Sequence, residues 1–241
     1  MVANLSFSAW DKPPWAIIGP VEIEDILVLK NNKGTEDNRV RKLDYSIQIS
    51  ELFYKRFINN QDISLFSPHD VDNLYDVFGS PEFDALYEKY ERNKKIPRKT
   101  INAQKLFMEL LKERAETGRI YIMNIDHCNT HSSFKDKVYM SNLCQEITLP
   151  TKPVQHIDDD KGEIALCILS AINLGMIKDK EELEELCDLS VRALDEIIDY
   201  QEYPVVAAKK STEARRSLGI GYIGLAHYLA KNKVKYNNQE A

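Results

Sequence analysis

The segment Ser141–Glu146, with the sequence S-N-L-C-Q-E, places an amide, a thiol and a carboxylate close together. If the segment is extended, the two-residue period of a strand puts Asn142, Cys144 and Glu146 on one face. Cys167 follows Cys144 by 23 residues, inside the apolar run I-A-L-C-I-L. A thiol nucleophile would need a base, and the segment holds no histidine. Radical or redox chemistry remains, and the alternative is two cysteines that are simply buried.

Two other groups of residues have chemical potential. Asp126–His131, with the sequence D-H-C-N-T-H, collects metal-binding side chains, but the chain has no C-x-x-C or H-x-x-x-H partner elsewhere. We expect a structural turn with hydrogen-bonded imidazoles. Gly219–Gly224 has the G-x-G-x-x-G spacing of a dinucleotide-binding loop, but polar and basic residues precede it and only 17 residues follow it. We expect these glycines to bind no dinucleotide and to permit close helix packing.

Composition limits the partners of the chain. The 241 residues include 32 Lys and Arg and 38 Asp and Glu, so the net charge is −6, which argues against a nucleic-acid partner. No apolar run approaches the ~20 residues of a membrane span, and no secretory signal begins the sequence. We therefore expect a cytoplasmic protein with no membrane contact. Its four cysteines are too few for a disulfide scaffold.

The elements that must position these groups alternate between strands and helices. Apolar spacing predicts a long helix over Glu36–Ile58. The other expected features are an irregular lead-in at 1–20, a strand or helix end at Val21–Leu29, a turn at Asn31–Gly34, a strand at Ile63–Phe66, helices at 81–92 and 101–117 with Gly118 as a stop and Leu106, Leu110 and Leu111 on one side, a strand at Arg119–Ile125, an apolar segment at Asn142–Leu149, a buried strand in Glu163–Leu174 and a helix at 178–202. This order favours an α/β domain with a largely parallel sheet or barrel, and no linker divides the chain.

Longer strings within residues 21–241 carry a resemblance to a known family. They are L-V-L-K-N-N-K-G-T-E-D-N-R-V-R (27–41), D-I-S-L-F-S-P-H-D-V (62–71), E-T-G-R-I-Y-I-M-N-I-D-H-C-N-T-H-S (116–132), S-N-L-C-Q-E-I-T-L-P-T-K-P (141–153) and G-E-I-A-L-C-I-L-S-A-I-N-L-G (162–175). Together with their order, they resemble the large, catalytic subunit of class I ribonucleotide reductase. The resemblance implies a portion of a ten-stranded α/β barrel with a catalytic finger loop.

The resemblance also implies roles for four residues in reducing ribonucleoside diphosphates to deoxyribonucleoside diphosphates. Cys144 resembles the cysteine that becomes a thiyl radical and abstracts the 3′ hydrogen of the ribose. Glu146 resembles the carboxylate that takes the 3′-hydroxyl proton, and Asn142 the amide that orients the ribose hydroxyls. Cys167 resembles one member of the redox pair that reduces the 2′ position. Cys128 and Cys187 match no catalytic position, so we expect both to be structural.

Further parts of the family's large subunit find no match in this sequence. These are the cysteine that pairs with Cys167, the regions that bind ATP and deoxynucleotide effectors, the phosphate-binding loop, the tyrosine pair that passes the radical inward and the C-terminal cysteine tail. The resemblance therefore implies three protein partners: complementary large-subunit chains, a metal-containing small subunit that supplies the radical, and thioredoxin or glutaredoxin as reductant. We expect the segment itself to bind no cofactor or metal.

Two functional hypotheses follow. In the first, the chain is the catalytic segment of a ribonucleoside-diphosphate reductase, a split-gene product or an excised fragment that is inactive without complementary chains. In the second, it is a non-catalytic remnant that only associates with other reductase chains. Exposed strand edges would drive association in either case.

Overall fold

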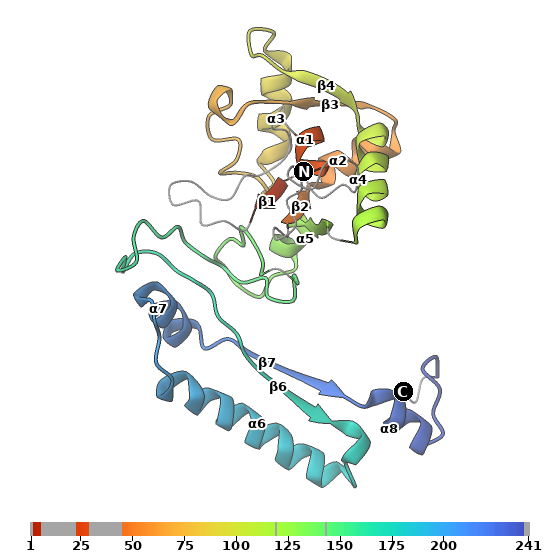
Figure 1. Cartoon of the computed structure of the whole chain (residues 1–241), viewed down its shortest axis with the longest axis vertical. Helices are drawn as coiled ribbons and strands as arrows, with labels where there is room; N and C mark the ends of the chain where they lie inside the picture. The colour runs from red at the N-terminus through yellow and green to blue at the C-terminus, as the bar shows by residue number, and fades with distance from the viewer. Residues whose placement is uncertain (1, 6–22, 29–44, 119, 143, 239–241) are drawn as a thin grey trace, which may run out of the picture. The chain divides into compact units, whose positions relative to one another are not determined.

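The computed structural model describes residues 2–5, 23–28, 45–118, 120–142 and 144–238 (Figure 1). The chain forms two compact units, Met1–Pro153 and Val154–Ala241. Pro150 and Pro153 directly precede the boundary, but no longer stretch rich in glycine, serine or proline marks it, so composition alone does not reveal this division. The turn expected at Asn31–Gly34 and most of the lead-in at 1–20 lie outside the described residues. Within the lead-in Val2–Leu5 is a strand, so the expected irregular structure is wrong there.

The first unit is built around a three-stranded sheet. Its central strand β2 (Tyr45–Ile49) pairs with β1 (Val2–Leu5) in the antiparallel sense and with β5 (Ile120–Asn124) in the parallel sense. The long helix expected over Glu36–Ile58 is therefore wrong, because Tyr45–Ile49 is a strand and, among the described residues 45–58, the helix is confined to α2 (Glu51–Ile58). Three consecutive side chains of β2, those at 47–49, are buried, as in a strand covered on both faces.

Local capping explains where the helices of this unit begin and end. The Ser50 hydroxyl accepts a hydrogen bond from the Phe53 amide and so starts α2 directly after β2. Asn102 caps α4 (Ala103–Thr117) in the same way, and Gly118 ends it at a φ of 66°. Leu106 and Leu110 of α4 are buried as expected, but Leu111 is exposed.

The remaining elements of this unit are short. They are α1 (Ile23–Leu27), β3 (Asp62–Leu65), the 3-10 turn η2 (Pro68–Asp70), α3 (Phe83–Arg92), β4 (Lys99–Asn102) and α5 (Ile125–Thr130). Within the segment expected at Val21–Leu29, the described residues 23–27 are thus helical. The strand at 63–66 and the helix at 81–92 are confirmed with small shifts of their ends. β3 and β4 form a separate antiparallel pair. One hydrophobic core, which includes Phe53, Phe66, Phe83 and Leu110, joins these elements.

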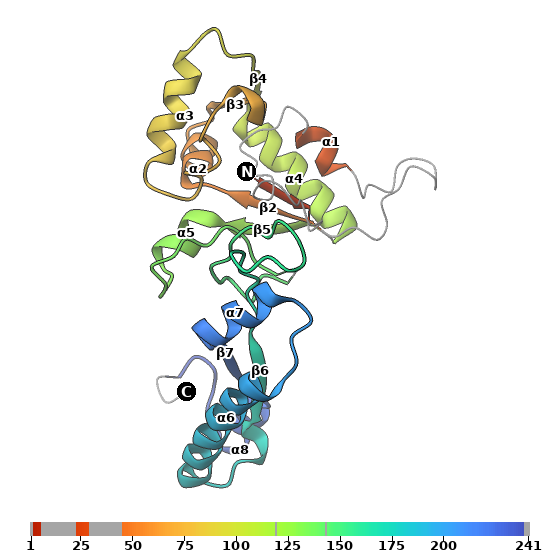
Figure 2. The same ribbon diagram turned by 90° about the vertical axis from the view of Figure 1, so that its left-hand side faces the viewer.

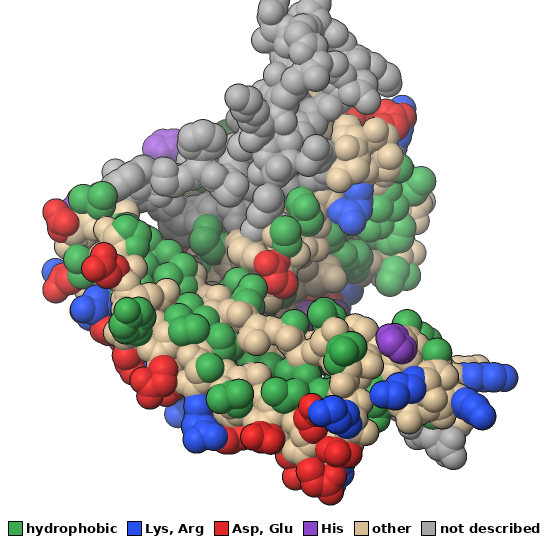
Figure 3. Space-filling view, turned by 60° about the horizontal axis from the view of Figure 1, so that its bottom comes forward, with side chains coloured by type: hydrophobic (Ala, Val, Ile, Leu, Met, Phe, Trp, Pro, Cys, Tyr) green, Lys and Arg blue, Asp and Glu red, His purple; other side chains and the backbone are tan. Residues whose placement is uncertain are grey.

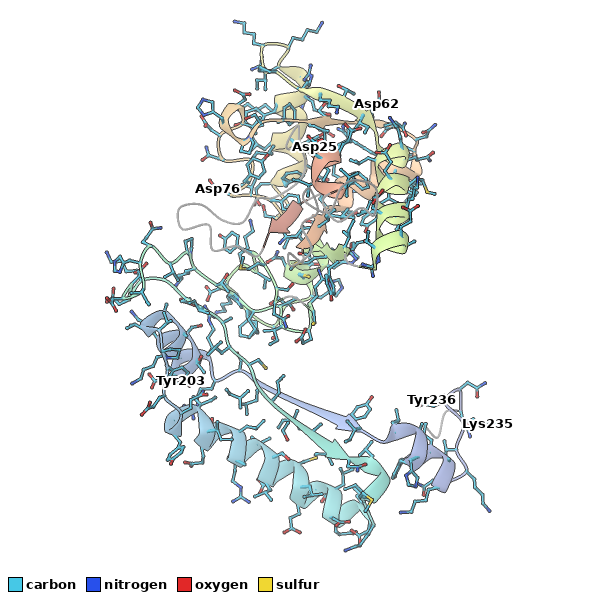
Figure 4. All side chains as sticks on the ribbon, in the orientation of Figure 1. Asp25, Asp62, Asp76, Tyr203, Lys235 and Tyr236 are labelled. Carbon is cyan, nitrogen blue, oxygen red and sulfur yellow. The ribbon has the colours of Figure 1, made fainter. Side chains whose placement is uncertain are left out.

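Tyr87 of α3 forms hydrogen bonds with the edge of β3 that is not paired with β4. Its fully buried hydroxyl donates to the Ser64 carbonyl at 2.8 Å and accepts from the Ser64 amide at 2.7 Å. Burial raises the pKa of Tyr87 well above its usual range, so the hydroxyl keeps its proton. Arg56, which donates to the carbonyl of Asp62 (Figure 4) and pairs with Glu91, lies over the same ring with its guanidinium carbon 5.0 Å from the ring centroid.

Replacing Tyr87 with phenylalanine should lower the free energy of unfolding by about 1–3 kcal/mol, because the Ser64 amide and carbonyl lose a buried partner. Urea denaturation followed by circular dichroism measures this loss. Tyr200→Phe is the matched control, because Tyr200 is 92% exposed. Equal stability of the two variants would contradict the role assigned to the Tyr87 hydroxyl.

The second unit is a two-stranded parallel sheet with helices. β6 (Ile168–Asn173) pairs with β7 (Leu218–Ile223), and α6 (Lys180–Tyr200) runs along both strands (Figures 1 and 2). The 3-10 turn η3 (Leu174–Met176), α7 (Val206–Arg215) and α8 (Leu225–Lys231) complete it. The helix expected at 178–202 is confirmed, with Asp179 as its N-cap.

This unit is much less covered than the sequence predicts. The run around Cys167 is typical of a fully buried strand, yet within β6 only Ile172 is buried, and Leu169 is 60% exposed. The space-filling view accordingly shows hydrophobic side chains at the surface between charged ones (Figure 3). None of the helices in the described part of the chain is both long and apolar enough to cross a membrane.

Candidate active site

A tight loop carries three of the four expected site residues. The Asn142 amide donates to the Ile147 carbonyl at 3.2 Å, and the Ile147 amide donates to the Asn142 side-chain oxygen at 3.0 Å. Within the loop the Gln145 amide donates to the Asn142 carbonyl at 3.2 Å. These hydrogen bonds close the loop across its base. Cys144 and Glu146 therefore lie in the chain between Asn142 and Ile147, which are hydrogen-bonded to each other.

The loop is not an extended strand, so the period-two argument for its shared face is wrong. Gln145 has a φ of 65°, in the left-handed region, which reverses the chain between Cys144 and Glu146. Its side-chain nitrogen is buried without a hydrogen-bond partner among the described residues. Sequence reasoning missed Gln145, because no residue-type signal marks a glutamine for this conformation. A turn thus takes the place of strand alternation in this segment.

Because one substrate ribose must meet all four expected site residues, the resemblance also predicts that Asn142, Cys144 and Glu146 line one face of a buried loop or strand. The predicted burial is wrong for this chain. Cys144 and Glu146 are exposed, and Asn142 is half-buried. The thiol and the carboxylate are therefore open to any group that approaches the loop from outside the chain.

The segment leading into the loop is fixed to the first unit. The Gln48 side chain of β2 donates to the Tyr139 carbonyl at 2.7 Å. Asn129 of α5 accepts from the Val138 amide at 2.8 Å and donates to the Val138 carbonyl at 3.1 Å. Lys137 donates to the Asp76 carbonyl (Figure 4), and burial lowers the pKa of Lys137. The central strand and the helix after β5 thus hold the start of the loop in place.

Cys167 belongs to the second unit and directly precedes β6. It is half-buried, and its sulfur lies 4.0 Å from the Ile168 carbonyl. Our prediction that the sulfurs of Cys144 and Cys167 approach to within the span of a ribose and its contacts, on the order of 10 Å, stays a prediction.

The cluster Asp126–His131 is helical rather than a turn, since it forms most of α5. Asp126 accepts from the Glu51 amide, and His131 lies within hydrogen-bond distance of the Thr130 hydroxyl and the His127 carbonyl. Burial raises the pKa of Asp126. In the part of the chain that the structure describes, no three His, Cys, Asp or Glu side chains are grouped to hold a metal ion.

The two remaining cysteines differ from each other. Cys128 packs against the core of the first unit, and burial raises the pKa of its thiol, as expected of a structural cysteine. Cys187 lies exposed on α6, and its expected structural role stays a prediction.

The glycines at 219–224 do not form a dinucleotide-binding loop. Gly219 and Gly221 lie inside β7, whereas a fingerprint places its glycines after the strand. Tight packing is confirmed, but the partner of Gly219 is the neighbouring strand and not a helix. A Cβ atom at Gly219 would lie 2.5 Å from Leu169 Cδ2. The absence of dinucleotide binding stays a prediction.

The described residues thus form mixed α/β units with the parallel pairs β2–β5 and β6–β7, and a closed loop of the chain carries a thiol and a carboxylate. Residues 18–241 match the family model of the ribonucleotide reductase barrel domain, and the chain belongs to this family. It is 59% identical to the ribonucleoside-diphosphate reductase subunit alpha of Buchnera aphidicola subsp. Schizaphis graminum and 58% identical to that of Haemophilus influenzae, in each case over 92% of the chain. It is 53% identical to ribonucleoside-diphosphate reductase 1 subunit alpha of Escherichia coli over 95% of the chain. The chain spans about 30% of the length of these relatives.

Proposed function

We propose that the chain supplies the radical loop and one redox cysteine for the reduction of ribonucleoside diphosphates to 2′-deoxyribonucleoside diphosphates. The observation that carries this proposal is the closed Asn142–Ile147 loop, which presents Cys144 and Glu146 in a chain of the reductase barrel family. The relatives of this chain are named for the same reaction.

In the proposed reaction Cys144 gives up its thiol hydrogen to a radical delivered from outside the chain. The resulting thiyl removes the 3′ hydrogen atom of the ribose, so the S–H bond re-forms as the C–H bond breaks. After the 2′ position is reduced, the Cys144 thiol returns the hydrogen atom to C3′ and becomes a thiyl again. The cysteine is thus regenerated in each turnover.

Glu146 takes the proton of the 3′-hydroxyl, which requires direct hydrogen-bond reach to the sugar. Asn142 contributes in two ways. Its side-chain oxygen accepts from the Ile147 amide and fixes the loop, which leaves the amide NH₂ group as the donor to a ribose hydroxyl. A positioned donor of this kind holds the sugar in the geometry for hydrogen abstraction.

Cys167 supplies one of the two thiols that reduce C2′. The 2′-hydroxyl leaves as water, two electrons come from the thiol pair, and the pair ends as a disulfide. The second thiol comes from another part of the large subunit, and thioredoxin or glutaredoxin returns the disulfide to thiols. A metal-containing small subunit supplies the radical.

Exposure of the loop supports the need for further chain. A radical on Cys144 would meet solvent and side reactions in this chain alone, and closing an active site against water prevents such losses. Exposed apolar side chains of the second unit, such as Leu169 and Ile223, also favour burial against another polypeptide. We therefore place residues 21–241 in one incomplete catalytic barrel that works in the cytoplasm, with ATP and deoxynucleotide effectors bound elsewhere in the large subunit.

The purified chain alone should form no deoxynucleotide with any reductant. Adding the complementary large-subunit polypeptide, the small subunit and a dithiol should restore formation of deoxynucleoside diphosphate, measured by chromatography. Product from the chain alone would contradict the requirement for complementary chains. A stable complex that forms no product would favour the alternative of a non-catalytic chain.

A further inference from the structure

The parallel register of β6 and β7 places Gly219 next to the strand that begins after Cys167. Leu169 pairs with Gly219, and Ala171 pairs with Gly221. In a parallel pair the side chains of register partners point to the same face, and that face alternates every second residue. The positions 167, 169 and 171 therefore face the same way as Gly219 and Gly221.

The missing side chain of Gly219 leaves space that Cys167 and Leu169 use. A Cβ atom at this position would lie 3.1 Å from the Cys167 sulfur and 2.5 Å from Leu169 Cδ2. Leu169 is largely exposed, so the end of its flexible side chain could turn away. The sulfur contact is also too short for ordinary packing, so Cys167 would have to move.

The backbone does not require glycine at position 219. The glycines with positive φ in the described residues are Gly79, Gly118 and Gly224, so Gly219 has a backbone that other residues can adopt. Glycine inside a strand weakens the strand, because it adds conformational entropy to the unfolded chain and packs nothing. A side chain at position 219 would instead fill the space beside Cys167 and Leu169.

Gly221 provides a matched comparison. It lies on the same face of the same strand, and its φ is also not positive. The nearest atom to a Cβ at this position is the Ser170 carbonyl oxygen, at 4.0 Å. A methyl group fits at Gly221, whereas at Gly219 it requires the end of Leu169 to turn away and the Cys167 sulfur to shift by a few tenths of an ångström.

We propose that Gly219 is a positioning residue for Cys167. Its bare backbone keeps open the space in which the Cys167 sulfur lies beside β7, and thereby sets the direction from which the thiol meets its reaction partner. This inference rests on the proposed function for its consequence in turnover, but the placement of the sulfur can be tested without activity.

The first test measures the alkylation of each cysteine of the full chain by iodoacetamide, followed by peptide mass spectrometry. Gly219→Ala should change the labelling rate of Cys167 by roughly threefold or more, the size expected when a side chain leaves its preferred rotamer. Exposed Cys187, in the same unit, serves as the internal standard. Gly221→Ala should leave the rates of both cysteines unchanged. An unchanged Cys167 rate in a folded Gly219→Ala chain would overturn the proposal.

A double variant separates Cys167 from Leu169. In Gly219→Ala/Leu169→Ala the contact with the leucine is gone and only the sulfur contact is left. The altered Cys167 labelling should persist relative to Leu169→Ala alone. Its return to the reference rate would show that Gly219 only makes room for Leu169, which would refute the assignment.

If Gly219→Ala does not fold, a double-mutant cycle can still test whether Gly219 makes space for the Cys167 sulfur. Cys167→Ala removes the sulfur, so it should restore folding to the Gly219→Ala chain or reduce its loss of stability in urea. Rescue by Leu169→Ala and not by Cys167→Ala would again count against the proposal.

In the reconstituted enzyme Gly219→Ala should lower kcat by roughly tenfold, since a misplacement of 1 Å can cost about 100-fold and the expected displacement is smaller. KM should stay within about twofold, because Cys167 acts after the nucleotide has bound. Altered labelling of Cys167 with unchanged kcat would support the role of Gly219 in placing the sulfur but contradict the redox role of Cys167. This outcome separates the positioning proposal from the proposed function. A rise in KM with constant kcat would contradict the positioning role itself.

Discussion

Cys144→Ser should abolish deoxynucleotide formation by the reconstituted reductase. A serine hydroxyl keeps the size and hydrogen-bonding capacity of the thiol, but its O–H bond is too strong to yield an equivalent radical. Because Cys144 is exposed on a loop closed by Asn142 and Ile147, the substitution should leave the fold and the stability of the chain unchanged. Product formation is measured under conditions in which the wild-type mixture turns over.

Cys187→Ser is the matched control, since Cys187 is also exposed and lies on α6 of the second unit. This variant should retain full activity. A Cys144→Ser complex with unchanged turnover would refute the radical assignment. Loss of activity in both variants would point to a general sensitivity of the assembly to cysteine replacement and equally contradict a specific role for Cys144.

Glu146→Gln should reduce kcat by about 10²- to 10⁴-fold, the usual contribution of a positioned general base. The amide keeps the shape of the side chain but cannot accept the 3′-hydroxyl proton. The side chain is exposed on the loop, so the loss should not come from unfolding. Steady-state rates of the reconstituted enzyme give kcat, and circular dichroism checks the fold.

Glu116→Gln, an exposed glutamate of α4, serves as the control and should change nothing. Glu146→Asp should recover part of the activity, because it restores a carboxylate at a shorter reach. A Glu146→Gln enzyme with wild-type kcat would remove Glu146 from the mechanism. Failure of the aspartate to exceed the glutamine variant would argue that the side chain acts only through its shape.

Helices with strong local signals could be predicted from the sequence. α4 starts at Asn102 and stops at Gly118, and α6 starts at Asp179, where the Glu182 amide donates to the cap. Caps and amphipathic spacing act within a few residues, so they are readable without knowledge of the rest of the chain. The same reasoning failed at Tyr45–Ile49, because a short apolar run can belong to either a strand or a helix.

The residues of the candidate site stay a prediction, whereas the extended geometry considered for their segment is wrong. The string S-N-L-C-Q-E marks Asn142, Cys144 and Glu146 through its resemblance to the reductase family, and the match of residues 18–241 to that family confirms the membership. Strand alternation was the wrong reason to group them. The structure shows instead a closed loop, formed by the left-handed backbone of Gln145 and the hydrogen bonds between Asn142 and Ile147.

The sequence by itself determined the family, the class of fold and the identity of the chemical groups, because these depend on residue type and order. Tertiary structure alone decided which side chains are covered. The apolar run around Cys167 is typical of a buried strand, yet the second unit leaves Leu169 exposed, since burial depends on what packs against the strand. It also decided that Gly219 faces Cys167, because the register of β6 and β7 brings together residues 52 positions apart.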